Sequence, residues 1–257
     1  MISAEDIATP LINLGEWPAR ILKGKMQKLS MKPRKRAVKI VAVEMFILKD
    51  REAWLQNRYK GIGGSEISAV IGCNPYMNNV KLFELKTGRI EAEDISEKPY
   101  VVYGTRAEEH LRALFELDFQ EYKVEYIENN SFYNSKYPWA RASIDGWLTD
   151  QEGRKGILEI KTTEILNSMH REKWNHQIPQ NYYCQVLFYM AVLEADFAIL
   201  KAQLKSQFKE EIYLQTKHYF LERKEVQADI DYLMKKGSEF WEYVKNDRFP
   251  PLVLPEF

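Results

Sequence analysis

The chain has 257 residues, of which 45% are hydrophobic and 13% aromatic, and its 37 Lys and Arg balance its 37 Asp and Glu. This length and composition suffice for one elaborated domain with a substantial buried core. The balanced charge excludes bulk electrostatics as an argument for a nucleic-acid partner, so local basic patches would have to bind one.

The two cysteines, Cys73 and Cys184, are too few for a disulfide-stapled secreted scaffold or a cysteine-based zinc site. The most apolar early stretch, residues 37–48, is interrupted by Lys39 and Glu44, and no signal-peptide pattern opens the chain. We therefore expect a cytoplasmic protein without membrane association.

Residues 1–36 differ in composition from the rest of the chain, because they end in a run of basic residues with few apolar anchors. We expect an N-terminal extension here and one domain over residues 37–257. The extension would be either a solvated tail or an arm that contacts DNA or a partner.

The remaining elements alternate between helical and extended patterns. Helices are predicted over residues 51–58, 65–71, 79–88, 103–118, 179–192 and 225–244, and strands over 37–43, 124–127, 131–133, 142–149, 156–162, 197–204 and 212–221. This order predicts a mixed α/β domain without internal repeats.

Side-chain alternation places a charged pair on one face of the strand predicted over residues 156–162. With a period of two, Glu159 and Lys161 share a face, while Leu158 and Ile160 take the other. An exposed hairpin can carry an ordinary Glu–Lys pair, so these two residues alone do not indicate a site.

The polar segment 150–155 predicts a hairpin centred on Glu152, which places Asp145 opposite Glu159. Directly opposed Cβ atoms lie roughly 4.5–5.5 Å apart, and two carboxylates there repel each other unless a cation lies between them. Magnesium prefers oxygen ligands and is usually held by one or two carboxylates and a substrate phosphate. Lys161 would then orient the attacking water or stabilise charge that develops on the phosphate.

A third acid is expected from the helix predicted over residues 103–118. At 100° per residue, Glu108 lies on the side of Leu111 and Phe115, whereas Glu109 points to solvent. Glu108 is therefore the better candidate, and a surface glutamate at the edge of the apolar face is the alternative.

Gln185 lies in a helix crowded with aromatic residues, which more often indicates core packing than nucleotide stacking. An amide in such surroundings needs a polar partner, and an active-site lysine or a phosphate would supply one.

The glycine-rich run 61–66 lacks the Gly-Lys-Ser/Thr ending of a nucleotide-binding loop and does not closely follow a predicted strand, so ATP binding is not expected. Backbone N–H groups of the helix that begins near Ser65 could hold a nucleic-acid phosphate, with Arg58 nearby. A simple helix cap is the alternative.

An ordered series of motifs within residues 50–247 resembles the phage lambda exonuclease and YqaJ-type viral recombinase family, which belongs to the PD-(D/E)XK nucleases. The series is Trp54, Arg58, Gly64-Ser65, Gly104, Glu108, Ser143-Ile144-Asp145-Gly146, Glu159-Ile160-Lys161, Tyr182 and Gln185. The resemblance implies a restriction-endonuclease-like α/β core, with a central mixed β-sheet flanked by helices. Ile144 stands where the family usually has proline, and the segment from Asp145 to Glu159 is longer than in lambda exonuclease.

The same resemblance implies residue roles. It assigns the metal to Glu108, Asp145, Glu159 and the backbone carbonyl of Ile160, catalysis to these acids with Lys161 and Gln185, and the 5′-phosphate of DNA to Arg58, Ser65 and Ser143. The implied cofactor is Mg²⁺, for which Mn²⁺ would substitute.

The implied function is 5′→3′ double-stranded DNA exonuclease activity in phage or prophage recombination, inside a bacterial host cell. The implied partners are DNA ends, a single-strand annealing protein and further copies of the chain, such as a trimer. An endonuclease on the same core is an alternative, whereas a Cas4-like nuclease would need four cysteines for its cluster. A non-catalytic DNA-binding or assembly module has no need for clustered acids that repel phosphate.

Overall fold

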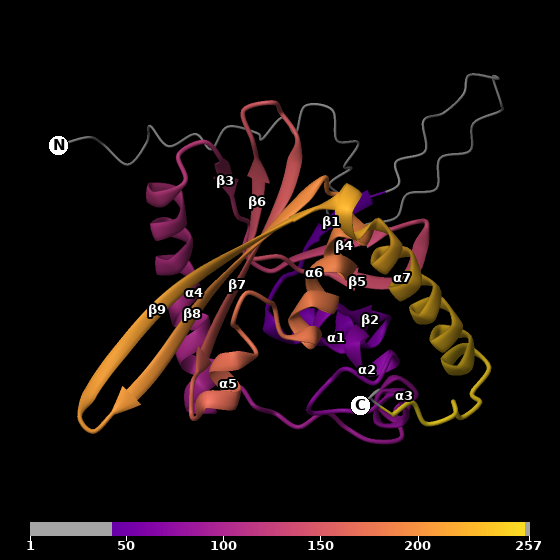
Figure 1. Ribbon diagram of the computed structural model, residues 1–257. Coiled ribbons are helices and arrows are strands. Elements are labelled where there is room, and N and C mark those ends of the chain that lie inside the picture. The colour runs from indigo at the N-terminus through magenta and orange to yellow at the C-terminus, as the bar shows by residue number, and fades with distance from the viewer. Residues whose placement is uncertain (1–42, 255–257) are drawn as a thin grey trace, which may run out of the picture.

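The computed structural model describes residues 43–254 of the protein (Figure 1). The extension predicted over residues 1–36, and all of the strand predicted over 37–43 except its last residue, lie outside this range. The elements, in chain order, are β1 (Val43–Ile47), α1 (Arg51–Tyr59), β2 (Ile62–Gly63), α2 (Gly64–Val70), α3 (Asn79–Lys86), α4 (Pro99–Asp118), β3 (Lys123–Glu125), β4 (Asn130–Asn134), β5 (Tyr137–Ala142), β6 (Gly146–Thr149), β7 (Lys155–Glu164), α5 (Ser168–Glu172), α6 (Gln180–Leu193), β8 (Phe197–Phe208), β9 (Glu211–Glu222) and α7 (Arg223–Lys245).

Two sheets organise these elements. The larger sheet has the order β3-β6-β7-β8-β9, with β7 and β8 parallel and the other neighbours antiparallel. The smaller sheet has the order β1-β4-β5-β2 and lies toward α7 (Figure 1). The predicted mixed α/β fold with a mixed sheet flanked by helices is confirmed.

The apolar face of β7 packs against α4. Leu158 and Ile160 form a buried cluster with Leu111 and Phe115 of α4. This contact confirms the alternation predicted for β7 and leaves Glu159 and Lys161 on the opposite side of the strand.

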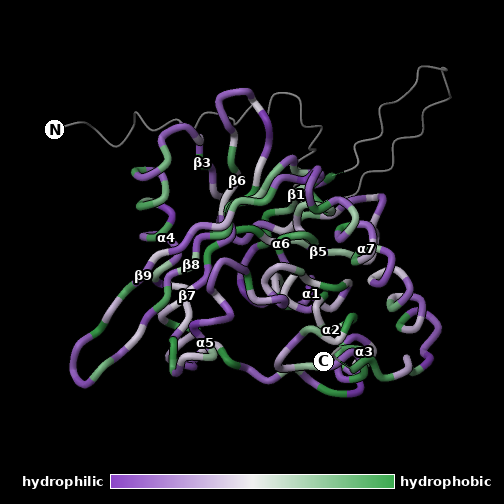
Figure 2. The backbone as a smooth tube through the Cα atoms, in the orientation of Figure 1, coloured by the Kyte–Doolittle hydropathy of each residue, from purple (hydrophilic) through white to green (hydrophobic). Residues whose placement is uncertain are grey.

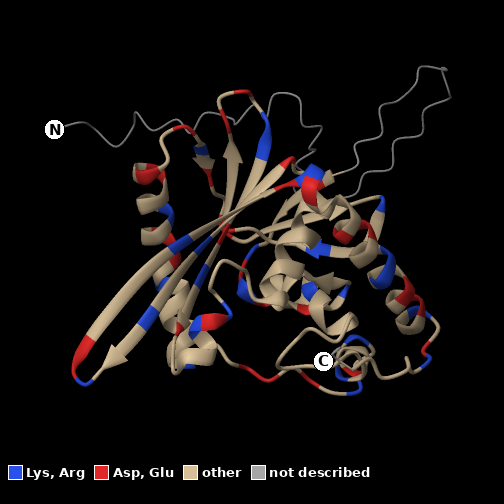
Figure 3. Ribbon diagram, in the orientation of Figure 1, with Lys and Arg blue, Asp and Glu red and all other residues tan. Residues whose placement is uncertain are grey.

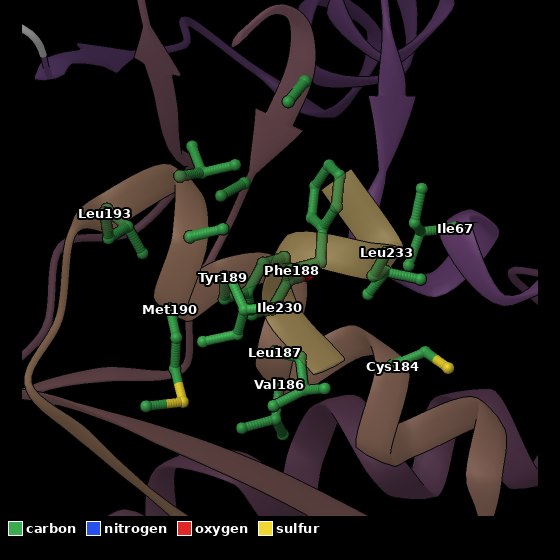
Figure 4. Packing of buried hydrophobic residues seen from close by; sticks show 14 of the residues in the cluster. Ile67, Cys184, Val186, Leu187, Phe188, Tyr189, Met190, Leu193, Ile230 and Leu233 are labelled. Atoms are coloured by element: carbon green, nitrogen blue, oxygen red, sulfur yellow. The ribbon is translucent and has the colours of Figure 1, made fainter. Parts of the chain in front are cut away.

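Helix α6 is the centre of the main core. It contains no charged residue (Figure 3) and is largely apolar (Figure 2), as expected for a helix buried on all sides. Figure 4 shows Phe188 and Tyr189 among Ile67 of α2 and Ile230 and Leu233 of α7, with which they share one buried cluster.

The strand predicted over residues 142–149 is wrong in part, because the chain is irregular between β5 and β6. The cause is Asn130, whose side chain donates to the carbonyl of Ile144 and accepts from the N–H of Ile144, both at 2.9 Å. A side chain therefore takes the place of a neighbouring strand here. Ile144 uses its N–H in this clamp, and the proline usual in the family has none.

Other boundaries differ more mildly from the predictions. Helix α4 begins at Pro99, four residues before the predicted start, because a proline at the first helical position suits the helical φ angle. Pro179 is the N-cap of α6 and not its first-turn residue. The short elements β2 and α5 were not predicted. Among residues 43–254, no helix is both long enough and apolar enough to cross a bilayer.

Candidate active site

Three side chains predicted for the site meet at one oxygen on the α6 side of β7. Lys161 Nζ lies 2.6 Å from Glu159 Oε1, and Gln185 Nε2 donates to the same oxygen at 2.7 Å. Gln185 Nε2 also donates to the Tyr189 hydroxyl at 3.1 Å. A lysine or a phosphate was predicted as the partner of Gln185, and in the structure its amide nitrogen donates to a carboxylate and a hydroxyl, with Lys161 at the same carboxylate oxygen.

Asp145 stands at the end of the β6–β7 ladder. The last pair is Gly146 with Leu158, which confirms the register predicted from a hairpin centred on Glu152. Beyond it, Asp145 Oδ2 accepts a hydrogen bond from the backbone N–H of Ile160 at 2.7 Å. This bond fixes the carboxylate of Asp145 beside the strand that carries Glu159.

Arg112 was not predicted to belong to the site. Its Nη1 atom donates to the carbonyl of Asp145 at 2.6 Å, and its guanidinium lies 3.6 Å from the centre of the Tyr126 ring. Arg112 follows Glu108 by one helical turn, so the spacing of four residues on one helix face is the signal that could have identified it.

Helix α4 brings Glu108 close enough to Asp145 for the two carboxyl groups to interact electrostatically. Glu108 is half-buried and Glu109 is exposed, as the helical projection predicts. Gly104 lets the helix approach β7 closely, because a Cβ atom there would lie 3.2 Å from Thr162 Oγ1.

Burial, and after it the crowding of acids, shifts the pKa values of this site. Burial, and then the charge of Asp145, raises the pKa of Glu159 to about 8 and that of Glu108 to about 7. Burial also raises the pKa of Asp145, against the opposing effect of Lys161. Burial alone would lower the pKa of Lys161, but Glu159 and Asp145 raise it above its ordinary value, so the ammonium stays charged.

The chemistry of these residues fits a divalent cation. Glu159 is only 2% exposed, and its Oε2 atom is buried without a hydrogen-bond partner. Mg²⁺ binds carboxylate oxygens, so the unpartnered Oε2 atom of Glu159, next to the second acid Asp145, is a suitable ligand. No three His, Cys, Asp or Glu side chains within residues 43–254 are arranged to enclose a metal ion. Lys161 and the N–H of Ile160 each contact one oxygen of Glu159 and Asp145, respectively.

A second polar group joins Arg58, Ser65 and Ser143, the residues predicted to hold a phosphate. Arg58 Nη2 donates to Ser65 Oγ at 3.0 Å, and its guanidinium lies 4.9 Å from the centre of the Trp54 ring. Trp54 Nε1 in turn donates to Ser143 Oγ at 3.4 Å. The structure therefore brings the three residues together through Trp54.

The sequence analysis predicted no strand directly before the helix near Ser65, but β2 directly precedes α2. The N–H of Gly63 donates to Glu66 Oε2 at 2.7 Å, so a helix cap accounts for this N–H group. Glu66 also contacts Lys86 Nζ at 2.8 Å and Arg58 at 3.4 Å. Sequence reasoning missed this network, although the spacing of Gly63 and Glu66 is that of a capping box.

Comparison with known proteins gives matches of three kinds: a related sequence, solved structures and a family profile. The uncharacterized protein YqaJ of Bacillus subtilis (strain 168) is 32% identical over 197 residues, which cover 74% of this chain and 55% of that protein. The chain thus spans about half the length of this relative.

Solved structures share the fold. The alkaline exonuclease LHK-Exo from Laribacter hongkongensis superposes with a TM-score of 0.53 at 16% identity, over 76% of this chain and 93% of that one. The structure of LHK-Exo in complex with dAMP gives a TM-score of 0.50 at 15% identity, with the same coverage.

The sequence profile of the YqaJ-like viral recombinase domain matches residues 53–196. This range contains Arg58, Glu108, Asp145, Lys161 and Gln185, and therefore most of both polar groups described above. Because the match covers more than half of the chain, the protein belongs to the YqaJ-like viral recombinase family.

Proposed function

We propose that this protein is a magnesium-dependent exonuclease that degrades double-stranded DNA in the 5′→3′ direction during phage or prophage recombination. The observation that carries the proposal is the buried contact of Glu159 with Lys161 and Gln185, next to Asp145. A metal-free binding module would gain nothing from buried acids with raised pKa values. The nuclease domain is proposed to span residues 37–257.

Glu108, Asp145, Glu159 and the backbone carbonyl of Ile160 are proposed to hold Mg²⁺, and Mn²⁺ would substitute. When bound, the cation would polarise a phosphate oxygen and lower the pKa of a nearby water. Lys161, which stays charged, stabilises negative charge on the phosphate and orients the attacking water. Gln185 fixes Glu159 by its hydrogen bond to Oε1.

Arg58, Ser65 and Ser143 are proposed to hold the 5′-phosphate of the strand that is degraded. A terminal phosphate carries more charge than an internal diester, so a guanidinium and two hydroxyl groups can select it. Holding the end while the next bond is cut favours directional progress over random nicking.

Partners of the reaction are proposed from family membership. The exposed single strand would be taken up by a single-strand annealing protein, and the chain would assemble with further copies, for example as a trimer. Because the chain spans about half the length of its Bacillus subtilis relative, both partners are proposed for the whole protein.

The test compares linear duplex labelled at the 5′ or 3′ end with a covalently closed circle, each with Mg²⁺ and with EDTA. The proposal expects magnesium-dependent loss of linear DNA that starts at the 5′ end, while the circle stays intact. Cleavage of the circle would favour an endonuclease on the same core. Binding of DNA without cleavage in either Mg²⁺ or Mn²⁺ would overturn the enzymatic proposal in favour of a binding or assembly module.

A further inference from the structure

We infer that Tyr189 is a positioning residue that links two groups of side chains. The first is the phosphate-binding group, Arg58, Ser65 and Ser143, and the second is the acidic centre, Asp145 and Glu159. The inference rests on the proposed function and extends it to a side chain outside both predicted sets. Tyr189 contacts Gln185 through its hydroxyl and Gly64 through its ring, so one rigid side chain spans the two groups.

The hydroxyl of Tyr189 is the second acceptor of the Gln185 amide. Nε2 of Gln185 has two hydrogens, and its two acceptors are Glu159 Oε1 at 2.7 Å and the Tyr189 hydroxyl at 3.1 Å. Both acceptors lie on the nitrogen side of the amide, so the flipped orientation would bring the amide oxygen against a carboxylate. The carboxylate thus sets the orientation of the amide, and the Tyr189 hydroxyl accepts its second hydrogen and helps to hold Gln185 against Glu159.

The ring rests on the backbone where α2 begins. A Cβ atom added at Gly64 would lie 2.3 Å from Cε1 and 2.6 Å from Cζ of Tyr189, closer than real Cβ contacts allow. Only glycine lets the ring approach this far. Gly64 precedes Ser65, the hydroxyl partner of Arg58, so the ring and the phosphate-binding group share one backbone segment.

The two contacts of Tyr189, with Gly64 and with Gln185, couple the start of α2 to the acids. Tyr189 is 6% exposed and lies one helical turn after Gln185 on α6, and a displacement of its ring also displaces the hydroxyl bonded to it. A shift of Gly64 would therefore reach Glu159 through two hydrogen bonds. The position of the bound strand end and the geometry of the acids are coupled in this way.

The first test removes only the hydroxyl. Tyr189→Phe keeps the ring against Gly64 but deprives Gln185 of one acceptor, so kcat should fall about tenfold, the upper range for one hydrogen bond. KM, and the preference for 5′-phosphorylated over hydroxyl ends, should stay as in wild type. Affinity for a phosphorylated duplex, measured by fluorescence anisotropy in EDTA, should also be unchanged.

Tyr183→Phe is the matched control. It removes a tyrosine hydroxyl from the same helix, but this hydroxyl donates to Asp229 of α7 at 2.7 Å and not to a residue of the site. Its kcat should equal that of wild type. A loss of kcat shared equally by both variants would reduce Tyr189 to a structural residue of α6 and overturn the inference.

The second test moves the ring. Gly64→Ala should lower both kcat and the preference for a 5′-phosphate, because the new methyl group displaces Tyr189. In Gly64→Ala with Tyr189→Leu, the smaller side chain makes room, so the phosphate preference should return while kcat stays low. This double variant also keeps the test usable if Gly64→Ala alone does not fold.

The outcomes distinguish the role of Tyr189 from the proposed function. A wild-type protein without magnesium-dependent nuclease activity would refute the proposed function. An active wild type with an equally active Tyr189→Phe would refute the role of Tyr189 and leave the proposed function standing.

Discussion

Two largely buried glutamate–lysine pairs, Glu66 with Lys86 and Glu159 with Lys161, shift the pKa of the glutamate in opposite directions. Burial would raise the pKa of Glu66, but Arg58 and Lys86 bring it below its ordinary value. Burial and a neighbouring acid raise the pKa of Glu159 to about 8. The lysine alone therefore does not decide the ionisation of either glutamate.

The two glutamates differ in pKa because their carboxylate oxygens have different numbers of polar partners. Oε2 of Glu66 accepts from Gly63 and Lys86, and its Oε1 contacts Arg58. Both partners of Glu159 contact Oε1, and Oε2 has none. The protein's own groups complete the Glu66 pair, whereas the Glu159 pair needs a further positive charge. We therefore expect loss of stability from breaking the first pair and loss of chemistry from breaking the second.

The largest effect is expected when the incomplete pair loses a charge. Glu159→Gln and Lys161→Ala should each lower the cleavage rate by about 10²–10³ or more, the usual effect of removing a preorganised catalytic group. The free energy of unfolding of Glu159→Gln should not fall, because the change relieves repulsion with Asp145. Rates on end-labelled duplex and urea denaturation measure the two quantities.

Glu164→Gln is the control for this comparison, because Glu164 lies at the exposed end of the same strand. Its rate should match that of wild type. Near-normal rates in folded Glu159→Gln and Lys161→Ala would remove both residues from the site.

Breaking the Glu66–Lys86 pair should lower the free energy of unfolding. Glu66→Gln leaves Lys86, whose side chain is 2% exposed, without its ionic partner. Breaking a buried pair in this way costs about 3 kcal/mol. Urea denaturation should show this loss, and Glu116→Gln, an exposed change on α4, should show none. If Glu66→Gln were as stable as wild type, the contrast between the two pairs would be wrong.

Arg58 contacts both Glu66 and Ser65, so its loss should affect the recognition of DNA ends. Arg58→Ala should lower the preference for 5′-phosphorylated ends about tenfold, since a hydrogen bond to a charged group contributes roughly 1.5–3 kcal/mol. Initial rates on duplexes that differ only in the terminal phosphate measure the preference.

Arg51→Ala is a matched control, because Arg51 also lies over the Trp54 ring, at 4.5 Å, but is exposed. It should leave the preference intact. Equal slowing of both kinds of end by Arg58→Ala would make Arg58 a general contact to the DNA backbone.

The last prediction concerns the dependence of stability on pH. Because folding raises the pKa of Glu159 and Glu108, the folded protein binds more protons than the unfolded chain between about pH 4.5 and about pH 8. Their contribution to stability is therefore full below this range and is lost as the pH rises through it. The contribution of Glu66 to stability depends on pH in the opposite direction, because its pKa is lowered in the folded protein. That contribution is lost only on acidification below its ordinary pKa.

The thermal unfolding midpoint in EDTA should consequently fall from about pH 5.5 to about pH 8.5, and fall less in Glu159→Gln. One kcal/mol corresponds to roughly 2–4 °C in a chain of this size. Identical slopes in the two proteins would contradict the raised pKa of Glu159.

Local periodicity predicted much of the site. The register of Asp145 against Glu159 followed from the symmetry of one hairpin, and the choice of Glu108 over Glu109 followed from helical geometry. Both inferences involve residues close in sequence or on a single element. Their proposed roles in metal binding and catalysis stay predictions.

Contacts distant in sequence were not predictable in the same way. The break before β6 depends on Asn130, which lies 14 residues before Ile144, and no pattern in the strand itself signals it. Lys86 reaches Arg58 and Glu66 from another helix. Such partners are determined by the tertiary packing, so propensity and spacing do not reveal them.

The clamp that Asn130 forms on Ile144 also bears on the size of the product. Ser143 and Asp145 flank Ile144, so their Cα atoms lie no more than about 7 Å apart. Asn130 holds the backbone of Ile144, the Ser143 hydroxyl donates to the carbonyl of Asn130, and the N–H of Ile160 holds the side chain of Asp145, so all three residues of this short segment are fixed. If the proposed nuclease binds the strand end near Ser143 and cleaves at Asp145, this segment would fix the distance between the bound end and the cleaved bond. Every turnover would then release a fragment of the same length.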